Sequence, residues 1–430
     1  MMEKVDVIIV GGGLAGLSCA HELVDSGMTV IVLERGDFSG SKNVTGGRIY
    51  LGPIRDYLPD LWKEAPLERH VTKEIVTLMG QTNSTTLELY CDRFNQEPYP
   101  SYTILRAKFD RWFADLVSEK GVFVIPKKNV EHLIKENGKV IGIRAGDEEI
   151  GADCVVAADG ILSFLAEEAG LRQPFKPQHF ALGFKEVIEL PSLTIEDRFG
   201  LGEGEGAAQL FVGSFTKGVM GGGFLYTNRE SVSLGIVVGI HSLNLREPRE
   251  EVYKLLDQFK ERPEIRNLIR GGNVVEYSAH LITEGGIHIK PKLYADGMLV
   301  VGDAAGFGLN MLVTVRGMEY AMASGVLAGR AIKKAKEKND FSASSLAHYE
   351  QLLDESFIMK EMNVFRNSLS ILESERLFLK YPQAISDLFE KVMRVDEHPK
   401  EGLYKTIAQG VKENFLNLDT IRDWLKFRKI

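Results

Sequence analysis

The start of the chain alternates between strand-like and helix-like hydrophobic patterns. Residues 5–10 form an apolar run rich in β-branched side chains, which is typical of a buried parallel strand. Apolar positions then continue at helical spacing to residue 24, Gly27 ends that segment, and residues 29–33 form a second strand-like run. The pattern predicts a strand–helix–strand unit.

The predicted turn between the first strand and the helix contains Gly11, Gly13 and Gly16 in G-x-G-x-x-G spacing. Such glycines permit a tight bend, a close approach of the backbone to a pyrophosphate, and close packing of the helix on the strand. The helix N-terminus faces the anion, and Glu34 after the second strand can accept hydrogen bonds from ribose hydroxyls. We therefore predict a dinucleotide site, because a glycine turn in an ordinary βαβ unit would leave Glu34 unexplained.

Residues 36–50 are polar and glycine-rich, and we expect them to form a loop beside the nucleotide. Arg35 and Lys42 are candidates to neutralise phosphate, and Gly46 with Gly47 provides a backbone that a flat ring can approach. A solvated surface loop is the alternative interpretation.

The next segment, residues 51–102, contains proline and charge clusters with one strand-like piece at residues 86–90. We interpret it as an excursion from the nucleotide domain. Residues 104–121 then carry apolar side chains at helical spacing, with Asp110 near the helix start and Arg106 just before it. Arg106 is either a surface cation or a ligand-binding residue.

Several short strands are predicted after this helix. They lie at residues 122–124, 130–134, 139–144, 148–150 and 154–157, with a turn at Asn137 and Gly138. The last strand leads into Ala158, Asp159 and Gly160. Ligand-facing turns of open α/β sheets occur at this kind of position.

The character of the chain changes between Pro174 and Pro177. Strand-like runs follow at residues 185–190, 208–213, 224–228 and 232–240, with no long helix before about residues 249–259. This predicts an antiparallel-sheet domain. Three consecutive glycines at residues 221–223 imply close approach of another backbone or of a flat ligand, or else a loose hairpin tip.

An α/β pattern returns at residues 294–301, where a buried strand leads to Gly302 and Asp303. A turn of small residues and a helix at residues 317–332 with small side chains on one face come next. Asp303 at the strand end can reach a ribityl or phosphate oxygen, although a helix N-cap would also explain it.

Beyond residue 341 the chain is predicted to be helical and charged, with amphipathic segments at residues 349–379 and 382–395. The last ten residues mix Trp424, Leu425 and Phe427 with basic side chains. This mixture is typical of an interfacial anchor or of a terminal helix packed on the domain.

Composition and charge exclude several classes of function. The chain has 430 residues and a net charge of −8, which argues against a nucleic-acid-binding protein. Its three cysteines, Cys19, Cys91 and Cys154, are too far apart to form an iron–sulfur or zinc framework and fit a reducing cytoplasm. The N-terminal run is too short for a signal peptide, and no apolar stretch is long enough to span a bilayer. We expect a cytoplasmic protein that meets a membrane only at its surface.

Three motifs occur in order: GGGLAG at residues 11–16 with Glu34, AADG at residues 157–160, and GDAAG at residues 302–306. Together they resemble the flavoproteins that share the p-hydroxybenzoate hydroxylase architecture. Residues 221–236 and 302–332 are similar to the FixC-type electron transfer flavoprotein:quinone oxidoreductases. Residues 221–236 lack the W-x-F-P signature of geranylgeranyl reductases, and residues 302–332 lack the proline that those reductases usually have there. The resemblance covers nearly the full length, and is weakest after residue 341.

This resemblance implies an α/β plus α+β fold. A Rossmann-like FAD-binding domain of the p-hydroxybenzoate hydroxylase type would comprise residues 1–50, 104–175 and 293–335. Residues 51–103 would extend toward an inserted antiparallel-sheet quinone or substrate domain at residues 176–292, and residues 336–430 would form a C-terminal helical region. The implied FAD-binding residues are Gly11, Gly13, Leu14, Ala15, Gly16, Glu34, Arg35, Gly46, Gly47, Arg106, Val130, Ala158, Gly160, Gly302, Asp303, Gly308, Asn310 and Thr314.

The resemblance further implies an FAD-dependent oxidoreductase that accepts electrons from an electron transfer flavoprotein and passes them to menaquinone or ubiquinone. Its expected partners are the alpha and beta subunits of that flavoprotein and a separate ferredoxin-like [4Fe–4S] protein, because the chain lacks a cluster-binding module of its own. Such complexes can bifurcate electrons. The expected location is cytoplasmic, peripheral on the inner face of the cell membrane. No catalytic side chain and no metal are implied, since the flavin carries the electrons.

Three alternatives remain open at this point. A geranylgeranyl (isoprenoid lipid) reductase would saturate double bonds on a similar scaffold. An aromatic hydroxylase would consume NADPH in an oxygen-dependent reaction. A flavin-loaded carrier without catalytic activity would pass electrons between partners and reduce no quinone.

Overall fold

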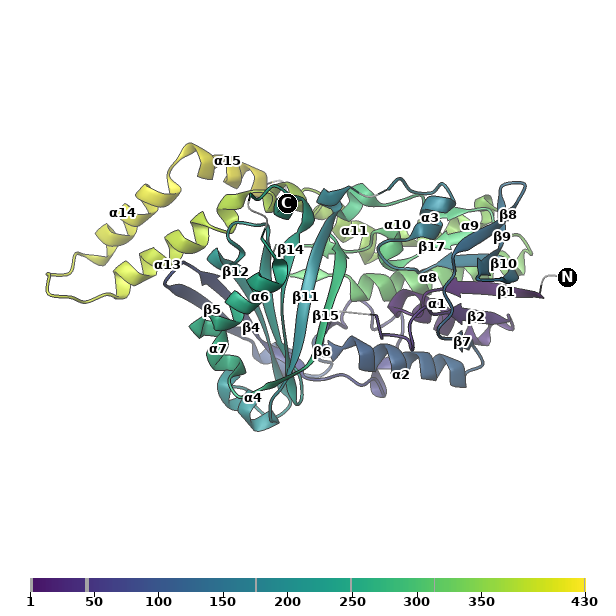
Figure 1. Cartoon of the computed structure of the whole chain (residues 1–430), viewed down its shortest axis with the longest axis horizontal. Coiled ribbons are helices and arrows are strands. Elements are labelled where there is room, and N and C mark those ends of the chain that lie inside the picture. Colours follow the sequence, from purple (N-terminus) through teal and green to yellow (C-terminus); the bar gives the residue numbers. More distant parts are fainter. Residues whose placement is uncertain (1–2, 43–45, 175, 248–249, 313, 429) are drawn as a thin grey trace.

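The computed structural model describes residues 3–42, 46–174, 176–247, 250–312, 314–428 and 430. Two sheets lie side by side along the long axis of the molecule, and helices of the C-terminal region extend beyond the second sheet (Figure 1). The N-terminus lies at the opposite end, beside the first sheet.

The first sheet is built around the predicted strand–helix–strand unit. Its parallel strands are ordered β17–β10–β1–β2–β7, and β16 and the β8–β9 hairpin pair antiparallel at its margins. Their bounds are β1 Glu3–Val10, β2 Val30–Leu33, β7 Phe123–Ile125, β8 His132–Glu136, β9 Lys139–Ala145, β10 Glu148–Ala157, β16 Tyr294–Ala295 and β17 Met298–Val300. The expected turn at Asn137 and Gly138 joins β8 to β9, with positive φ at both residues.

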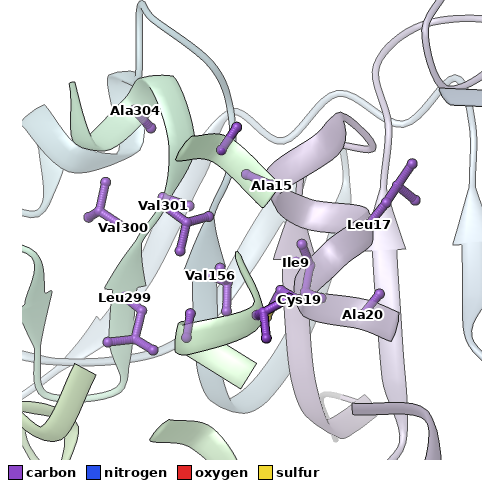
Figure 2. Close-up of a cluster of buried hydrophobic side chains, with 14 of the residues drawn as sticks. Ile9, Ala15, Leu17, Cys19, Ala20, Val156, Leu299, Val300, Val301 and Ala304 are labelled. Atoms are coloured by element: carbon purple, nitrogen blue, oxygen red, sulfur yellow. The ribbon is translucent and has the colours of Figure 1, made fainter. Parts of the chain in front are cut away.

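Three helices cover this sheet: α1 (Leu14–Leu23), α2 (Arg106–Glu119) and α8 (Met318–Glu337). Helix α8 packs directly on α1, because a side chain at Gly325 would lie only 2.1 Å from the Ala15 carbonyl oxygen. Buried side chains of β1, β10, β17 and α1 form one cluster, which includes Ile9, Val156 and Leu299 (Figure 2). The small residues predicted on one face of α8 therefore permit a close helix–helix contact.

The second sheet draws strands from two distant parts of the chain. Its order is β15–β11–β14–β13–β12–β4–β6–β3, with β5 paired to β4. The bounds are β3 Gly46–Tyr50, β4 His70–Met79, β5 Ser84–Tyr90, β6 Ser101–Leu105, β11 Phe180–Glu189, β12 Glu205–Gly213, β13 Gly221–Thr227, β14 Ser231–Gly239 and β15 Asn273–Thr283.

The strands of residues 176–292 pair antiparallel with one another. Strand β4 of the earlier segment extends this sheet and pairs parallel with β12. One expectation for this region was wrong. Residues 46–50 do not belong to a loop, because they form β3, which pairs with β6. Residues 43–45 of the expected loop lie outside the described residues.

Arg69 holds the junction between β4 and the rest of the second sheet. Its side chain is 2% exposed, and its guanidinium nitrogens donate to Glu196, to Ser192 and to three backbone carbonyl oxygens. These acceptors lie on β12, on the β13–β14 connection and on α4 (Ser192–Phe199). One fully paired arginine thus connects the segment of residues 51–103 to the strands that follow residue 176.

The helices of the second domain only partly match the prediction. Helix α4 was not expected, and the helix predicted at residues 249–259 is α6 (Val252–Glu261), with Arg249 outside the described residues. Phe259 of α6 lies against the three-glycine segment, where a side chain at Gly223 would meet its ring at 2.6 Å. Side chains at Gly221 and Gly222 would meet backbone oxygens of neighbouring strands. The glycines therefore permit close packing within the protein. The other helices here are α5 Ile240–Asn244 and α7 Pro263–Ile269.

The C-terminal region is helical but more divided than expected. The segment predicted at residues 349–379 breaks near Ser356, whose hydroxyl caps the next helix. The bounds are α9 Ala343–Leu346, α10 His348–Glu355, α11 Phe357–Val364, α12 Ser368–Leu372, α13 Lys380–Met393, α14 Leu403–Phe415 and α15 Leu418–Phe427. In the described part of the chain, no helix has the length and apolar character to cross a membrane.

Candidate functional site

The turn between β1 and α1 brings the first motif to the carboxyl end of the first sheet. Gly11 has φ +113°, and a side chain there would lie 2.2 Å from the Ala158 carbonyl oxygen. Gly13 precedes α1, and a side chain there would meet nothing within 4 Å. Leu14, Ala15 and Gly16 form the buried first turn of α1. The turn is therefore closed on its strand side and open where a pyrophosphate would approach.

Glu34 lies at the end of β2 with its carboxylate turned back toward this turn. Its oxygens accept hydrogen bonds from the Gly12 amide at 2.8 Å and the Gly36 amide at 2.6 Å. The buried hydroxyls of Ser39 and Ser41 flank the same carboxylate and have no hydrogen-bond partner among the described residues. This part of the site thus contains polar groups that a ligand with several hydroxyls could satisfy.

Two predicted residues lie near Glu34 without forming hydrogen bonds to it. The chain before β8 runs beside this position, since the Lys128 amide donates to the Glu34 carbonyl at 2.8 Å, and the half-buried Val130 follows two residues later. Arg35 is exposed.

The second and third motifs also meet the β1–α1 turn. The Ala158 amide donates to the Val10 carbonyl at 2.9 Å, and Gly160 follows with positive φ. Gly302 lies against Ala15, where an added side chain would approach the Ala15 Cβ to 2.7 Å. The three motifs, far apart in sequence, therefore lie together at the ends of β1, β10 and β17.

Asp303 and Arg106 interact electrostatically across the site. Burial raises the pKa of the Asp303 carboxyl, and the charges of Arg106 and His280 oppose that rise. Within the described part of the chain, this carboxylate has no side-chain hydrogen bond. Arg106 is the first residue of α2. Its Nε and Nη2 atoms donate to the two carboxylate oxygens of the buried Asp110, each at 2.7 Å. Asp303 is thus a half-buried carboxyl with unused hydrogen-bonding capacity.

A short hairpin after Asp303, β18 (Leu309–Asn310) with β19 (Val315–Arg316), carries the remaining predicted residues. The Asn310 side-chain amide donates to Glu284 Oε2 at 3.3 Å, and the Thr314 hydroxyl lies 2.6 Å from the Tyr50 hydroxyl. Gly308 lies against Thr283, whose Cγ2 would be 2.4 Å from a side chain placed there. The hairpin therefore joins the first domain to β3 and to the end of β15.

The two glycines expected to admit a flat ring lie in β3. Gly46 is paired with Leu105, next to Arg106. Gly47 lies against the ring of Tyr226, 3.4 Å from the position a side chain would take. At Gly47 the backbone is therefore approached by an aromatic side chain of the protein itself.

Sequence reasoning missed four polar residues of this region: Ser39, Ser41, Thr283 and Glu284. The two serines lie in the loop that was predicted to approach the nucleotide, so their hydroxyls could have been proposed from that position alone. Thr283 ends a strand that was not predicted and Glu284 follows it, and no local motif marks either residue.

Three family models match the chain. They are the FAD dependent oxidoreductase model at residues 6–97, the model for the ubiquinone-binding part of ETF-QO at residues 180–282, and the ETF-QO/FixC family C-terminal domain at residues 370–430. The second covers β11 to β15, and the third covers α12 to α15.

Curated relatives match over nearly the full length. The chain is 41% identical to Protein FixC of Escherichia coli K12 over 429 residues, covering 99% of each chain. It is 40% identical to the "Probable electron transfer flavoprotein-quinone oxidoreductase YdiS" of the same organism, covering 99% of this chain and 98% of the relative. The chain belongs to the ETF-QO/FixC family. Protein FixC of Azorhizobium caulinodans is also 40% identical, over 93% of this chain and 92% of the relative.

Solved structures share the fold of this family member. A geranylgeranyl bacteriochlorophyll reductase-like protein of Thermoplasma acidophilum superposes with a TM-score of 0.73 at 21% identity, covering all of both chains. The halogenase PltM, solved in complex with FAD, gives 0.62 at 14% identity over 90% of this chain and 79% of its own. The expected fold class is thereby confirmed, and this FixC-family chain is an FAD-dependent oxidoreductase.

The residues present fit FAD. The open turn at Gly13, the hydroxyls of Ser39 and Ser41 beside Glu34, and the half-buried Asp303 carboxylate offer polar groups that have no side-chain partner among the described residues. When bound, FAD supplies the electron transfer chemistry.

Proposed function

We propose that this FAD-dependent oxidoreductase accepts electrons from an electron transfer flavoprotein and passes them to a membrane quinone, menaquinone or ubiquinone. The observation that carries the proposal is the full-length similarity to FixC and ETF-QO relatives, together with the ubiquinone-binding model over β11 to β15. A flavin suits this step because it exchanges electrons singly or in pairs.

The proposed FAD-binding residues lie at the β1–α1 turn, at the ends of β2, β10 and β17, at the start of α2, and on or beside the neighbouring strands and hairpin. Gly11, Gly13, Leu14, Ala15 and Gly16 would hold the pyrophosphate with the help of the start of α1. Other residues are proposed as follows: Glu34, Arg35 and Val130 at the adenosine end, Asp303, Arg106, Ala158, Gly160 and Gly302 along the ribityl chain, and Gly46, Gly47, Gly308, Asn310 and Thr314 beside the ring system.

The partners proposed for this chain are the alpha and beta flavoprotein subunits and a separate ferredoxin-like [4Fe–4S] protein. Cys19 and Cys154 are buried in the first domain and Cys91 lies in the second, so the described residues contain no cysteine cluster. An iron–sulfur cluster would have to be supplied by a partner. A complex of this composition could bifurcate electrons, with this subunit on the quinone branch.

The deciding experiment is anaerobic. The chain is purified with its co-expressed partners, the flavin is reduced stoichiometrically, and its reoxidation is followed after adding a menaquinone analogue or, separately, a geranylgeranyl lipid. We expect reoxidation by the quinone. Reoxidation only by the lipid, with a saturated product, would establish a prenyl reductase instead, which is the alternative favoured by the fold similarity to the Thermoplasma protein.

A peripheral membrane location on the cytoplasmic face is also part of the proposal. Large apolar side chains are exposed at helical spacing on α14 and α15: Leu403, Tyr404, Ile407, Leu418, Ile421, Trp424 and Leu425. Basic Arg422 and Lys426 interleave with them on α15, and Arg428 directly follows the helix. Apolar and basic residues on one helix favour an anionic lipid surface. Helix α14 lies away from the two sheets, and α15 leads back from it toward the second sheet (Figure 1).

Vesicle flotation tests this surface against the competing one. The edge strand β5 also exposes apolar side chains, Leu87 and Leu89. We expect the double variant Ile421→Ser and Trp424→Ser to lose binding to phosphatidylglycerol vesicles, while Leu87→Ser with Leu89→Ser retains it. The reverse result would move the membrane contact to the second sheet. Equal binding by both variants and the wild type would refute a contact through either surface.

A further inference from the structure

Glu284 is a buried carboxyl between the two parts of the molecule. It follows the last residue of β15, two positions beyond the segment that matches the ubiquinone-binding model. Its backbone amide donates to the His179 carbonyl at 2.9 Å, and its side chain is 5% exposed. Its position therefore lies between the segment similar to quinone-binding proteins and the β18–β19 hairpin.

Asn310 fixes the orientation of this carboxyl. The Asn310 carbonyl oxygen accepts from the Leu312 amide at 3.0 Å, which turns its amide nitrogen toward Glu284 Oε2 at 3.3 Å. This is the one side-chain hydrogen bond of Glu284 among the described residues. A single long hydrogen bond stabilises a carboxylate only weakly, so most of its hydrogen-bonding capacity stays unused.

No neighbouring cation neutralises Glu284 within the described part of the chain. The other titratable side chains on the elements packed around it have hydrogen-bond partners of their own: His179, His280, His288, Lys290, Arg316, Lys360 and Glu361. Lys176 lies beside His179. Burial raises the pKa of the Glu284 carboxyl from its ordinary value of 4.5 to about 7, against the opposing hydrogen bond from Asn310. Near neutral pH this group exchanges a proton readily.

The surroundings of Glu284 also offer a polar ligand a place to bind. The Thr283 hydroxyl is buried and has no partner among the described residues. A side chain built on Gly286 would find only Leu309 Cδ1, at 4.0 Å. Along the chain, Glu284 is therefore flanked by a residue with an unpaired hydroxyl, Thr283, and by open space at Gly286.

We propose that Glu284 is the acid that delivers a proton to the quinone oxygen during quinone reduction. The proposal rests on the proposed function and adds a catalytic side chain, which the sequence analysis did not expect. The quinone takes two electrons from the reduced flavin and two protons. The Glu284 O–H bond breaks as a quinone O–H bond forms, a second proton comes from the reduced flavin or water, and the carboxylate recovers its proton from solvent.

The test uses the conservative variant Glu284→Gln in the purified flavoprotein. Glutamine keeps an acceptor for Asn310, so FAD content should be unchanged. Stopped-flow reoxidation by a menaquinone analogue should slow by about 100-fold or more at pH 6, since general acids contribute on that order. The wild-type rate should fall about tenfold per pH unit above pH 7, and the variant rate should not depend on pH.

Two further measurements separate proton transfer from a structural effect. Reoxidation by ferricenium, which takes one electron and no proton, should be equal in wild type and variant. Infrared spectra of the oxidised protein should show a carboxylic-acid band that titrates with a midpoint of about 7 and is absent in Glu284→Gln. The control Glu186→Gln removes another buried carboxyl, which is paired with Lys260 at 2.9 Å, and should leave the quinone rate and its pH dependence unchanged.

Each outcome decides the proposal. Unchanged quinone reoxidation and pH dependence in Glu284→Gln would refute the role of Glu284 while leaving the proposed function intact. A wild-type protein that reacts with ferricenium and not with quinone would refute the proposed function and this inference together. Equal loss with quinone and ferricenium in the variant would assign Glu284 a structural role.

Discussion

Two polar clusters of this molecule differ in how completely their groups are paired. Around Arg69 the guanidinium nitrogens all have acceptors, on two side chains and three backbone carbonyls. In the candidate site, Asp303 has no side-chain partner in the described residues, Glu284 has one, and the hydroxyls of Ser39 and Ser41 have none there. Leaving a buried polar group unpaired costs about 1–3 kcal/mol. In these two clusters, the arginine that joins parts of the second sheet is fully paired, and the candidate site keeps polar groups that a ligand or a proton could pair.

Removing Arg69 should have the largest effect, and it should fall on stability alone. Arg69→Met leaves Glu196 and three buried carbonyls without their donor, so we expect the free energy of unfolding to drop by about 3–5 kcal/mol. Urea denaturation measures this loss, and the folded fraction should keep its FAD. Arg198→Met is the control, since that arginine is half-exposed and donates to two carbonyls at the sheet margin; a similar loss there would contradict the comparison.

Glu284 should make stability depend on pH in the opposite direction from a paired carboxylate. The pKa of Glu284 is about 7 in the folded protein and has the ordinary value of 4.5 in the unfolded chain. Between these two pH values the folded protein keeps the Glu284 proton, whereas the unfolded chain has released it. The free energy of unfolding therefore falls as pH rises through this window, by about 3 kcal/mol from this group. Urea denaturation of wild type and Glu284→Gln at pH 4.5 and 8 isolates the contribution of Glu284 to the free energy of unfolding. A difference between the two proteins that stays constant with pH would refute it.

Asp303 should affect cofactor binding more than folding. Replacing it by asparagine removes a charged acceptor, and hydrogen bonds to charged groups contribute about 1.5–3 kcal/mol, so the FAD dissociation constant should rise about 10- to 100-fold. The flavin-free protein should be no less stable than wild type at pH 7, because burial already raises the pKa of this carboxyl. Flavin fluorescence titration and thermal unfolding measure the two effects; unchanged affinity would remove Asp303 from the proposed site.

The smallest effect is expected at a paired but half-exposed contact. Arg376 binds the buried carboxylate of Asp423 through two hydrogen bonds of 2.7 Å and so attaches α15 to the preceding helices. Because Arg376 is partly exposed, Arg376→Ala should cost about 1 kcal/mol or less in global stability, and should mainly speed proteolysis within α15. The exposed pair of Arg394 with Asp396 is the control, and Arg394→Ala should change neither readout.

The sequence predicted the first sheet better than the second, and the reason is the range of the interactions. The β1–α1–β2 unit is encoded by apolar runs, glycines and Glu34 within thirty-five residues. The parallel pairing of β12 with β4 joins residues more than 130 positions apart, which no local pattern reveals. Strand β15 was missed because it lies at the edge of the sheet and exposes polar and apolar side chains alike.

The candidate site divides in the same way. Gly11, Glu34 and Asp303 could be proposed because each lies at a fixed place in a motif next to a predicted strand. Glu284 could not be, because its environment is created by burial between β15 and the β18–β19 hairpin, and burial of one carboxyl leaves no signature in the neighbouring residues. Whether the motif residues contact FAD remains a prediction that the Asp303 variant tests.

The pairing of β12 with β4 also bears on how the chain emerges during synthesis. When β4 has left the ribosome, its parallel partner is still more than a hundred residues from being made, and α8, which covers α1, comes later still. Ribosomes add about 5–20 residues per second, so β4 would wait several seconds or more with its strand edge and apolar face unprotected. The nascent chain is therefore expected to depend on chaperones until about residue 340 has emerged, and chains truncated before α8 should aggregate.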